Sequence, residues 1–379
     1  IAALAATSAF AQSTVTSYGL LDFGYSQATY DKNDKLQTSR KGFATSADNS
    51  SRWGMTGTED LGSGVKAEFK IESGIGTNPR SGISQDLQTR NGLAAGNAYT
   101  LDATVLGDRE LWAAVSKGNT RIQAGYGVTA LRNLAVQTDA AGSNLMGNPI
   151  AHEMGAYRRA GLQVSQTFAP GLVATLAATG NRQLSGTNAA DTYQVGRGFN
   201  GALTYAQGPL NVGIAYDEMA TQNPAISGTD TPPGASAASL AAANSNLKST
   251  LVAGSYDLGV AKLFAQYYAV NLIDNTSTAI QKGEGKKTAF SVGARFPIGA
   301  AEPFVQYFDG KNKQSGLAAT AGESRDWTGY SVGARYNLSK RTYAYVATGQ
   351  YKTAAGSVLA TYGDKAVYKQ TAAGIAHAF

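Results

Sequence analysis

Apolar and polar residues alternate with a period of two along much of the chain. In GVKAEFKIESG, residues 64–74, the apolar residues share one parity and the charged residues share the other. The apolar set is Val65, Ala67, Phe69 and Ile71, and the charged set is Lys66, Glu68, Lys70 and Glu72. A helix would mix the two sets, whereas a strand places them on opposite faces. The segment is therefore predicted to be a strand with one apolar and one charged face.

The same alternation recurs in segments far apart in the sequence. Examples are NVGIAYD at 211–217, AFSVGARFP at 289–297 and GYSVGARYN at 329–337. In these segments aromatic residues tend to stand at the strand ends and on the apolar face. An aromatic ring with a polar tip suits the headgroup layer of a bilayer, so this placement is typical of the interfacial girdles of membrane barrels.

The connections between the predicted strands alternate between short and long. The short ones are 61–64, 117–119, 169–171, 206–209, 257–260, 298–302 and 338–341. The long polar ones lie near 31–50, 76–108, 128–155, 183–196, 220–247, 274–286, 310–326 and 353–366. Turns this short join antiparallel neighbours, and seven short turns with eight long loops predict sixteen strands. All long loops then lie at one end of the sheet.

A sheet of this size is predicted to close into a barrel. No segment with a helical period of 3.6 is evident that could cover a sheet edge, and closure removes the edges. A barrel of about sixteen strands encloses an aqueous channel rather than a packed core. The expected fold is an all-β, sixteen-stranded antiparallel transmembrane barrel. Its charged faces look into the channel and its apolar faces into lipid.

Composition adjusts this interpretation only slightly. The mean hydropathy is −0.21, and no apolar run is long enough for a transmembrane helix, but barrel strands hide their apolar face in the alternation.

Residues 1–11 are small and apolar, and Ala9-Phe10-Ala11 fits a signal-peptide cleavage site. We therefore expect residues 1–11 to be a residual signal and 12–379 to be the barrel domain. The chain has no cysteine. The net charge of +6 is scattered, which argues against nucleic-acid binding.

Five stretches together resemble the trimeric general porins of Gram-negative outer membranes, of the Neisseria and Burkholderia type. They are VTSYGLLDFGY (15–25), SRWGMTGTEDLGSGVKAEFKIESG (51–74), GDRELWAAVS (107–116), GYSVGARYNLSKRTYAY (329–345) and the terminal GIAHAF. The resemblance implies an outer-membrane homotrimer, short periplasmic turns, long extracellular loops and a third loop folded into the pore. It also implies outer-membrane lipid, lipopolysaccharide and small ions or solutes as partners.

The resemblance further implies which residues face the inward-folded loop, here 128–155. Arginines on the wall of related anion-preferring porins correspond to Arg52, Arg109 and either Arg158 or Arg159. The chain also departs from the family pattern. Its loop reads NLAVQTDAAGSNLMGN, Tyr126 follows Gly125 where the family often has Arg, and Ala376 replaces a common Arg. These departures bear on the geometry of the pore rather than on the fold.

Parity places more basic than acidic residues on the lumenal side. The basic set is Arg52, Lys66, Lys70, Arg121, Arg159, Arg295 and Arg335, opposed by Glu68 and Glu72. Loop 128–155 contributes Arg132, His152, Asp139 and Glu153. Such a wall predicts passive diffusion with a moderate anion preference. A substrate-specific channel for small anionic solutes is the alternative, and merely solvated lumen charges would leave the pore near neutral in selectivity.

Other functions find little support in the residues. His152 and His377 are the two histidines, and no Ser/His/acid set for a barrel enzyme is recognisable. No His or Cys cluster suggests a metal, no cofactor motif is evident, and a loop Ca²⁺ site from carboxylates such as Asp230 or Glu323 is non-specific. GYG at 125–127 lacks a convincing following helix for a phosphate loop.

The terminal AAGIAHAF continues the alternation. Ala373, Ile375, His377 and Phe379 are predicted to face lipid from a sixteenth strand that pairs with residues near 14–25 and closes the barrel. Phe379 would sit at the periplasmic girdle. In the resembling family, such an ending is also the signal for insertion into the outer membrane.

Overall fold

The structure, a computed structural model, describes residues 13–32, 34–75, 106–141, 158–179, 182–184, 193–195, 198–221, 245–274, 283–315, 326–353 and 366–379. The first half of the described chain contains β1 (Thr14–Lys32), β2 (Lys35–Thr45), β3 (Arg52–Gly62), β4 (Val65–Gly74), β5 (Glu110–Lys117), β6 (Thr120–Val128), α2 (Ala130–Gln137), β7 (Arg158–Ala169), β8 (Leu172–Thr179), β9 (Arg182–Leu184) and β10 (Tyr193–Val195). The second half contains β11 (Gly198–Gln207), β12 (Leu210–Thr221), β13 (Ser245–Asp257), β14 (Lys262–Asp274), β15 (Gly283–Arg295), β16 (Ala301–Ser315), β17 (Trp327–Asn337), β18 (Thr342–Thr353) and β19 (Ala366–Ala378).

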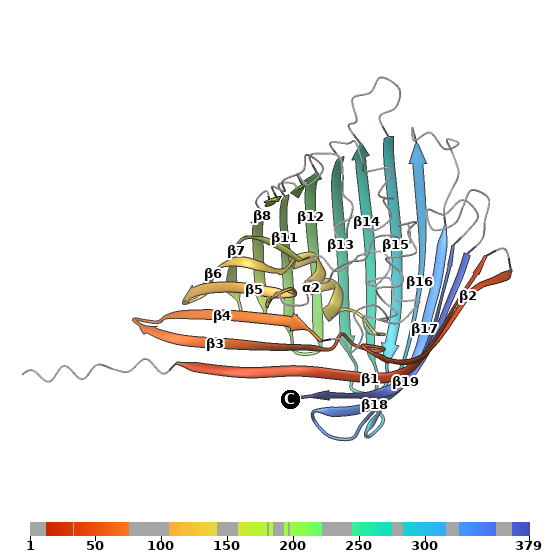
Figure 1. The fold of residues 1–379 in the computed structure, drawn as a ribbon. Coiled ribbons are helices and arrows are strands. Elements are labelled where there is room, and N and C mark those ends of the chain that lie inside the picture. Colours follow the sequence, from red (N-terminus) through yellow and green to blue (C-terminus); the bar gives the residue numbers. More distant parts are fainter. Residues whose placement is uncertain are drawn as a thin grey trace, which may run out of the picture.

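One antiparallel sheet of 17 strands closes on itself (Figure 1). It has sixteen strand positions because β2 and β3 lie in tandem beside β1. Phe23–Lys32 of β1 pair with β2, and Thr14–Leu20 pair with β3. On its other side, β1 pairs with β19 and so closes the barrel. The predicted sixteen-stranded barrel is confirmed, and strands join at all seven short turns.

The prediction that residues 31–50 form the first long loop is wrong. The chain turns after Lys32 and returns as β2 at Lys35, and residues 46–51 then leave the sheet before β3 begins. We call residues 46–51 the inner bend. The polar sequence KLQTSRKGFAT of β2 shows no clear alternation, which is why the strand was not recognised. Its backbone groups bond to the adjacent edge of β1, and this pairing does not depend on the side chains.

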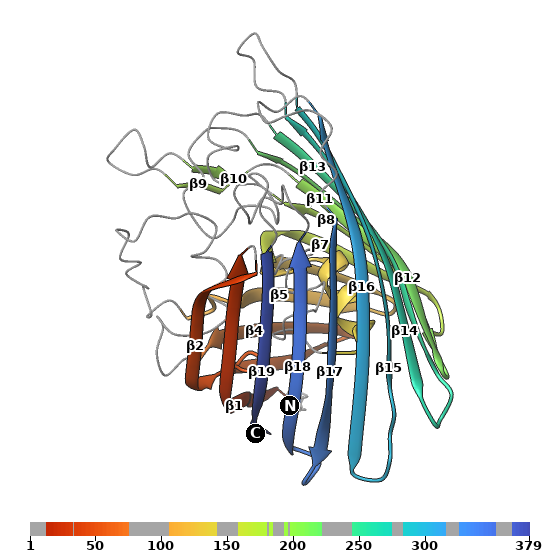
Figure 2. The same ribbon diagram turned by 90° about the vertical axis from the view of Figure 1, so that its right-hand side faces the viewer.

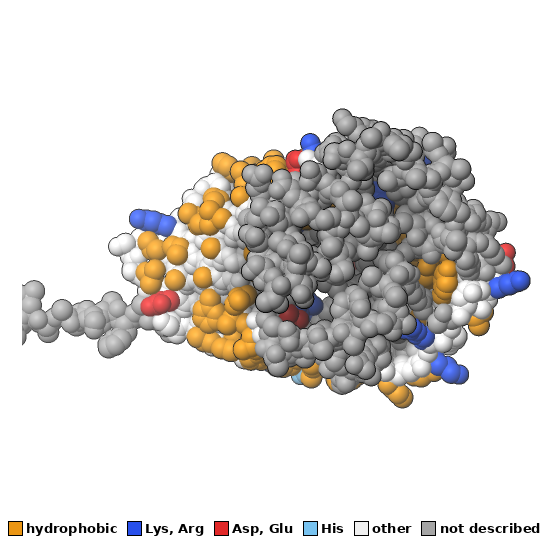
Figure 3. Space-filling view, turned by 45° about the horizontal axis from the view of Figure 1, so that its top comes forward, with side chains coloured by type: hydrophobic (Ala, Val, Ile, Leu, Met, Phe, Trp, Pro, Cys, Tyr) orange, Lys and Arg blue, Asp and Glu red, His pale blue; other side chains and the backbone are white. Residues whose placement is uncertain are grey.

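The outer face of the barrel carries large apolar side chains. Exposed members include Leu111, Val115, Ile122, Leu162, Leu176, Val212, Ile214, Val252, Phe290, Val292, Val305, Tyr330, Val332 and Ile375. Figure 3 shows hydrophobic side chains over much of the visible outer wall. Exposing this apolar surface to water would cost a large free energy, whereas contact with lipid does not. The apolar parity predicted for these strands thus forms the lipid-facing surface.

Helix α2 lies inside the ring of strands and was missed by the sequence analysis (Figure 1, Figure 2). Thr129 caps it, with its hydroxyl accepting a hydrogen bond from the backbone N–H of Arg132 at 3.3 Å. Leu131, Leu134 and Ala135 are buried. Their i, i+3, i+4 spacing and the preceding Thr are the helix signals in the sequence, but eight residues were too few to stand out. The expectation that no helix follows 125–127 is wrong.

The barrel seam differs in register from the expectation. Strand β19 pairs with Leu20–Lys32, so the predicted partner range of 14–25 is right for 20–25, while Thr14–Leu20 pair with β3 on the opposite edge of β1. Gly19 and Phe379 exchange two backbone hydrogen bonds of 3.0 and 3.1 Å. A Cβ on Gly19 would overlap the Phe379 ring, so the seam requires glycine there. The loop predicted at 183–196 contains the β9–β10 hairpin.

Candidate pore constriction

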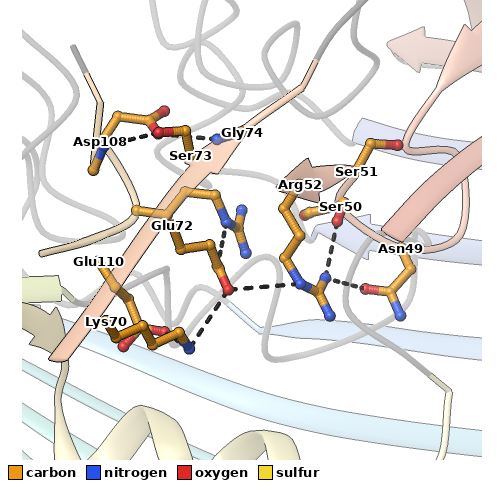
Figure 4. A network of polar contacts seen from close by, with 12 residues as sticks. Asn49, Ser50, Ser51, Arg52, Lys70, Glu72, Ser73, Gly74, Asp108 and Glu110 are labelled. Atoms are coloured by element: carbon orange, nitrogen blue, oxygen red, sulfur yellow. Dashed lines mark hydrogen bonds and ion pairs between the residues drawn. The ribbon is translucent and has the colours of Figure 1, made fainter. Parts of the chain in front are cut away.

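A cluster of charged side chains lies on the inner face of β3, β4 and β5, with Glu72 at its centre (Figure 4). The Glu72 carboxylate accepts hydrogen bonds from Arg109 Nε at 2.7 Å and from the Tyr18 hydroxyl at 2.8 Å. Lys70 lies 3.5 Å away and Arg52 3.8 Å away. The alternation that exposes Phe69 and Ile71 to the outer face turns Lys70 and Glu72 inward. Strand geometry therefore brings together four of the predicted pore residues.

Glu110 and Arg158 extend this cluster. Lys70 donates to Glu110 at 2.7 Å, and Glu110 also accepts from the indole N–H of Trp112 at 3.0 Å. Arg158, the first residue of β7, lies within electrostatic range of Arg109, Glu110 and Glu72. We define the Glu72 cluster as Tyr18, Arg52, Lys70, Glu72, Arg109, Glu110 and Arg158. Four cations against two carboxylates leave it with an excess of two positive charges.

Arg159, the alternative to Arg158, has a different environment. Its guanidinium forms a bidentate pair with Asp217 of β12, at 2.5 and 2.8 Å. Fork geometry and burial make such pairs strong. Because Asp217 compensates its charge, Arg159 adds little to the field in the lumen. Sequence analysis did not identify Asp217, although its inward parity in NVGIAYD was evident.

Three further predicted residues, Arg121, Glu68 and Lys66, lie on the same wall nearer the short turns. Arg121 donates to Glu68 at 2.8 Å and stacks over the Trp112 ring, 4.7 Å from its centroid. The Arg121–Glu68 pair is therefore close to neutral. Lys66 is exposed, beside the turn at 61–64 and in register with Asp60. It stands apart from the Glu72 cluster.

The described part of the predicted constriction loop, through residue 141, folds against the opposite wall. Leu131, Leu134 and Ala135 pack against inward-facing Ala215, Leu247, Leu251, Ala253, Tyr268 and Val270 of β12, β13 and β14. This apolar wall is unlike the charged inner face of β4. The predicted inward fold of the loop is thus observed for its first half, and residues 142–155, with His152 and Glu153, lie outside the described residues.

Polar side chains missed by the sequence analysis hold this loop. Asn200 accepts from the backbone N–H of Ala130 at 3.2 Å, at the start of α2. Gln266 donates to the carbonyls of Ala135 and Thr138 at 2.8 and 3.0 Å. Gln306 accepts from the N–H of Ala141 at 2.8 Å. These amides pair with backbone N–H and C=O groups, at and beyond the helix ends, that the helix itself leaves without a partner. They therefore hold the loop in its position on the wall. Their inward parity was the only sequence signal.

Arg295 and Asp139 take part in the same docking. Arg295 Nε donates to the Ala140 carbonyl at 2.7 Å and its Nη1 to Glu302 at 3.1 Å. The Asp139 carboxylate accepts from the N–H of Ala141 at 3.3 Å, and the residue is buried. Arg132 lies on α2, partly exposed. Arg295 and Asp139 therefore serve the loop's attachment, where the sequence suggested open lumen charges.

The inner bend is a second segment that folds toward the lumen. Asp22 of β1 accepts from the N–H groups of Asp48 and Asn49 at 2.7 and 2.5 Å, and from the Tyr345 hydroxyl at 2.6 Å. The Asp48 carboxylate accepts from the Tyr343 hydroxyl at 3.0 Å and lies 3.1 Å from Arg335. Arg335, predicted to face the lumen, thus pairs with the bend.

Neither a metal centre nor a helical membrane span is found in the described ranges. No group of three or more His, Cys, Asp or Glu side chains among those residues could hold a metal ion. Within the same ranges, no helix is long and apolar enough to cross a bilayer.

Comparison with known proteins identifies the family. The sequence model of the Gram-negative porins matches residues 1–356, which is most of the chain. The chain belongs to the Gram-negative porin family. As a porin, it forms an outer-membrane pore for the passive diffusion of small hydrophilic solutes, and the family indicates a channel rather than an enzyme.

Individual relatives agree with this assignment. The chain is 28% identical over 385 residues to an outer membrane porin of Bordetella pertussis, covering 90% of each protein. Among solved structures, it is similar to an anion-selective porin from Comamonas acidovorans, with a TM-score of 0.69, 21% identity and coverage of 97% of this chain and 100% of that one. It is also similar to the trimer form of OmpT from Vibrio cholerae, with a TM-score of 0.60, 13% identity and 96% and 99% coverage. At these identities the structures establish the shared fold.

Proposed function

We propose that this porin prefers small anions, moderately, and that the Glu72 cluster is the main source of the preference. The observation that carries the proposal is the excess of two positive charges on one wall. The Arg159–Asp217 and Arg121–Glu68 pairs compensate their own charges. Within the described residues of the cluster, Arg52, Lys70, Arg109 and Arg158 share two carboxylates, Glu72 and Glu110.

A pore strengthens the effect of such an excess. Low-dielectric walls focus the field of the cluster into the water between them and raise the local concentration of anions. At physiological salt, screening limits this effect to about 8 Å. The preference is therefore expected to be moderate and to decrease as salt rises. Diffusion needs no bond-making residue, so the pore works without catalysis, cofactor or metal.

The Arg52→Ser variant tests the source of the preference. Under a KCl gradient in a planar bilayer, wild-type protein should give channel steps and an anion-selective reversal potential, and Arg52→Ser should shift that potential toward cations. The matched control is the double variant Arg159→Ser/Asp217→Ser, which removes a compensated pair and should shift it little. A cation-selective wild type, or an Arg52→Ser variant without a shift, would refute the proposal.

Solute flux separates the proposal from its alternative. A general pore should show flux that rises linearly with solute concentration. Saturation for one small anionic solute would favour a substrate-specific channel, in which the cluster acts as a binding site. Liposome swelling with a series of small carboxylates and neutral sugars makes this measurement.

We also propose that the chain assembles as a homotrimer in contact with outer-membrane lipid and lipopolysaccharide, after removal of residues 1–11 as a signal. The homotrimer is supported by the fold shared with the trimer form of OmpT. Phe379 is proposed as the insertion signal, and its two backbone bonds to Gly19 give it a role in the seam as well. Deleting Phe379 should lower the amount of heat-modifiable trimer while leaving the conductance of assembled pores unchanged. Normal trimer levels without Phe379 would contradict this.

A further inference from the structure

The inner bend lies directly beside the arginine that the proposed anion preference depends on. The chain leaves the sheet at Ser46, whose φ of 66° is in the left-handed region, and re-enters it at Arg52. Ala47, Asp48 and Ser51 are buried, and Ala47 packs against Tyr345 and Ala372. A six-residue connection with half its residues buried is held in one position rather than free in the lumen.

The bend holds the guanidinium of Arg52. Arg52 Nη1 donates to the Ser50 carbonyl at 2.9 Å and reaches Asn49 Oδ1 at 3.5 Å (Figure 4). Its Nε lies 3.8 Å from Glu72, beyond hydrogen-bond distance. The bend and Glu72 therefore attract different nitrogens of the Arg52 guanidinium, Nη1 and Nε respectively. Without the bend, the guanidinium would close this gap to a hydrogen bond with Glu72, and its charge would move toward the strand that carries Glu72.

The position of the bend depends in turn on Asp48. Its carboxylate is 1% exposed and is held by Arg335 of β17 and Tyr343 of β18. Asp22 reinforces this by accepting from the bend's N–H groups. A buried carboxylate held by a guanidinium and a hydroxyl is costly to displace, since any other position leaves a charge unpaired. Asp48 thus links the bend to the far side of the barrel seam.

The same row of charges reaches the other inward segment. Arg335 is in register with Glu302, and Glu302 bonds to Arg295 at 3.1 Å. Arg295 then donates to the Ala140 carbonyl of the loop that contains α2. Charged side chains on β15, β16 and β17 therefore contact both segments that fold into the lumen, Arg295 at Ala140 and Arg335 at Asp48. Loss of Asp48 would free Arg335 to draw Glu302 away from Arg295.

We infer that Asp48 is a positioning residue for selectivity: it fixes the inner bend so that the bend holds Arg52 away from Glu72, with its charge directed to passing ions. The inference rests on the proposed anion preference. Asp48 does not need to touch the ion. It acts through the bend, and its own negative charge is compensated by Arg335.

The sign of one measurement separates this role from a plain charge effect. Removing a lumenal carboxylate by itself should raise the Cl⁻/K⁺ permeability ratio, and Glu68→Gln, which does not contact the bend, is the matched control for that effect. Asp48→Asn should instead lower the ratio. The expected decrease is about 1.5-fold, as for a unit charge that retreats from about 5 to about 6 Å from the ion path in water. Reversal potentials of the full-length trimer under a KCl gradient give both ratios.

Tyr343→Phe provides a second test without any change of charge. It removes the hydroxyl that donates to Asp48 and should lower the ratio less than Asp48→Asn does. The inference is overturned if Asp48→Asn raises the ratio as Glu68→Gln does, or if Tyr343→Phe leaves it at the wild-type value. A wild type without anion preference would refute the proposed function instead, and opposite signs for Asp48→Asn and Glu68→Gln would still support the positioning role.

Discussion

The two sides of the lumen differ in what their inward side chains do. On β3, β4 and β5 they are charged and form the Glu72 cluster. On β12, β13 and β14 they are largely apolar, and α2 packs against them. One wall therefore meets water and ions, whereas the other forms a small protein core inside the barrel.

This difference shows where the period-two pattern carries information. On β4, charged and apolar residues separate cleanly by parity. On β13, Leu251 is fully buried and its neighbour Val252 is 45% exposed, yet both are apolar. The pattern marks the inner face only where that face meets water. Where a loop covers the wall, both faces become apolar and the alternation disappears.

The largest predicted effect comes from Leu134→Asp, which sets a charge against the apolar wall. Leu134 is 1% exposed, and a buried unpaired carboxylate there should undock α2. Removing the side chain alone by Leu134→Ala should cost about 2–5 kcal/mol of docking free energy. The expected result is a higher single-channel conductance and faster protease cleavage within 130–141, with the trimer preserved.

Val136→Asp is the matched control for the same helix. Val136 is 49% exposed, so its substitution should leave α2 docked and cleavage unchanged, and it reports the effect of the added charge alone on conductance. If Leu134→Asp behaves like Val136→Asp, α2 does not narrow the pore and the apolar wall has no role in conduction.

The next effect sharpens the description of the charged wall. Glu72→Gln removes the central carboxylate and leaves Arg52, Lys70 and Arg109 less compensated. The Cl⁻/K⁺ permeability ratio should rise about two- to three-fold, as expected for one unit charge about 6 Å from the ion path in water. Glu59→Gln, at an exposed position near the turn at 61–64, should leave it unchanged. A decrease with Glu72→Gln would mean that the carboxylate chiefly holds the arginines in place.

A smaller effect is predicted for Gln266→Leu on the apolar wall. The variant keeps a side chain of similar volume but leaves the carbonyls of Ala135 and Thr138 without this donor. Unpaired buried groups cost about 1–3 kcal/mol, less than the apolar packing of α2. We expect more frequent fluctuations of the open-channel current with an unchanged mean conductance. Gln207→Leu, at an exposed turn position, is the control, and equal noise in both variants would contradict the expected role of Gln266.

The sequence predicts the barrel better than its interior. Strand faces and short turns follow from local patterns, such as the parity of 65–72 and the glycines in the turns. Each of these patterns depends on one short segment of the chain alone. The contacts of Asn200, Gln266 and Asp217 join residues more than 50 positions apart, as do those of Asp48 with Arg335. Parity gives the face on which such residues lie but not the partner they meet.

Ala376 illustrates the same limit. Its departure from the family pattern had no explanation in the sequence. In the structure it is fully buried on the inner face and stands in register between Asp22 on β1 and Tyr343 on β18. Both neighbours hold the inner bend. A small residue there leaves room for the bend, and this could be seen only once β1, β18 and β19 were side by side.

The β1–β19 seam has a consequence for the order of events in folding. Leu20 pairs with Ala378, so the bonds that close the barrel join segments at opposite ends of the described chain. Hairpins such as β13–β14 can form early, but closure carries the largest loop entropy and depends on the strand made last. Until β19 arrives, β1 presents an unpaired edge of thirteen residues to whatever else is in the periplasm. We expect the lifetime of this state with an unpaired β1 edge, rather than the strength of any one contact, to determine the fraction of molecules that aggregate before they reach the membrane.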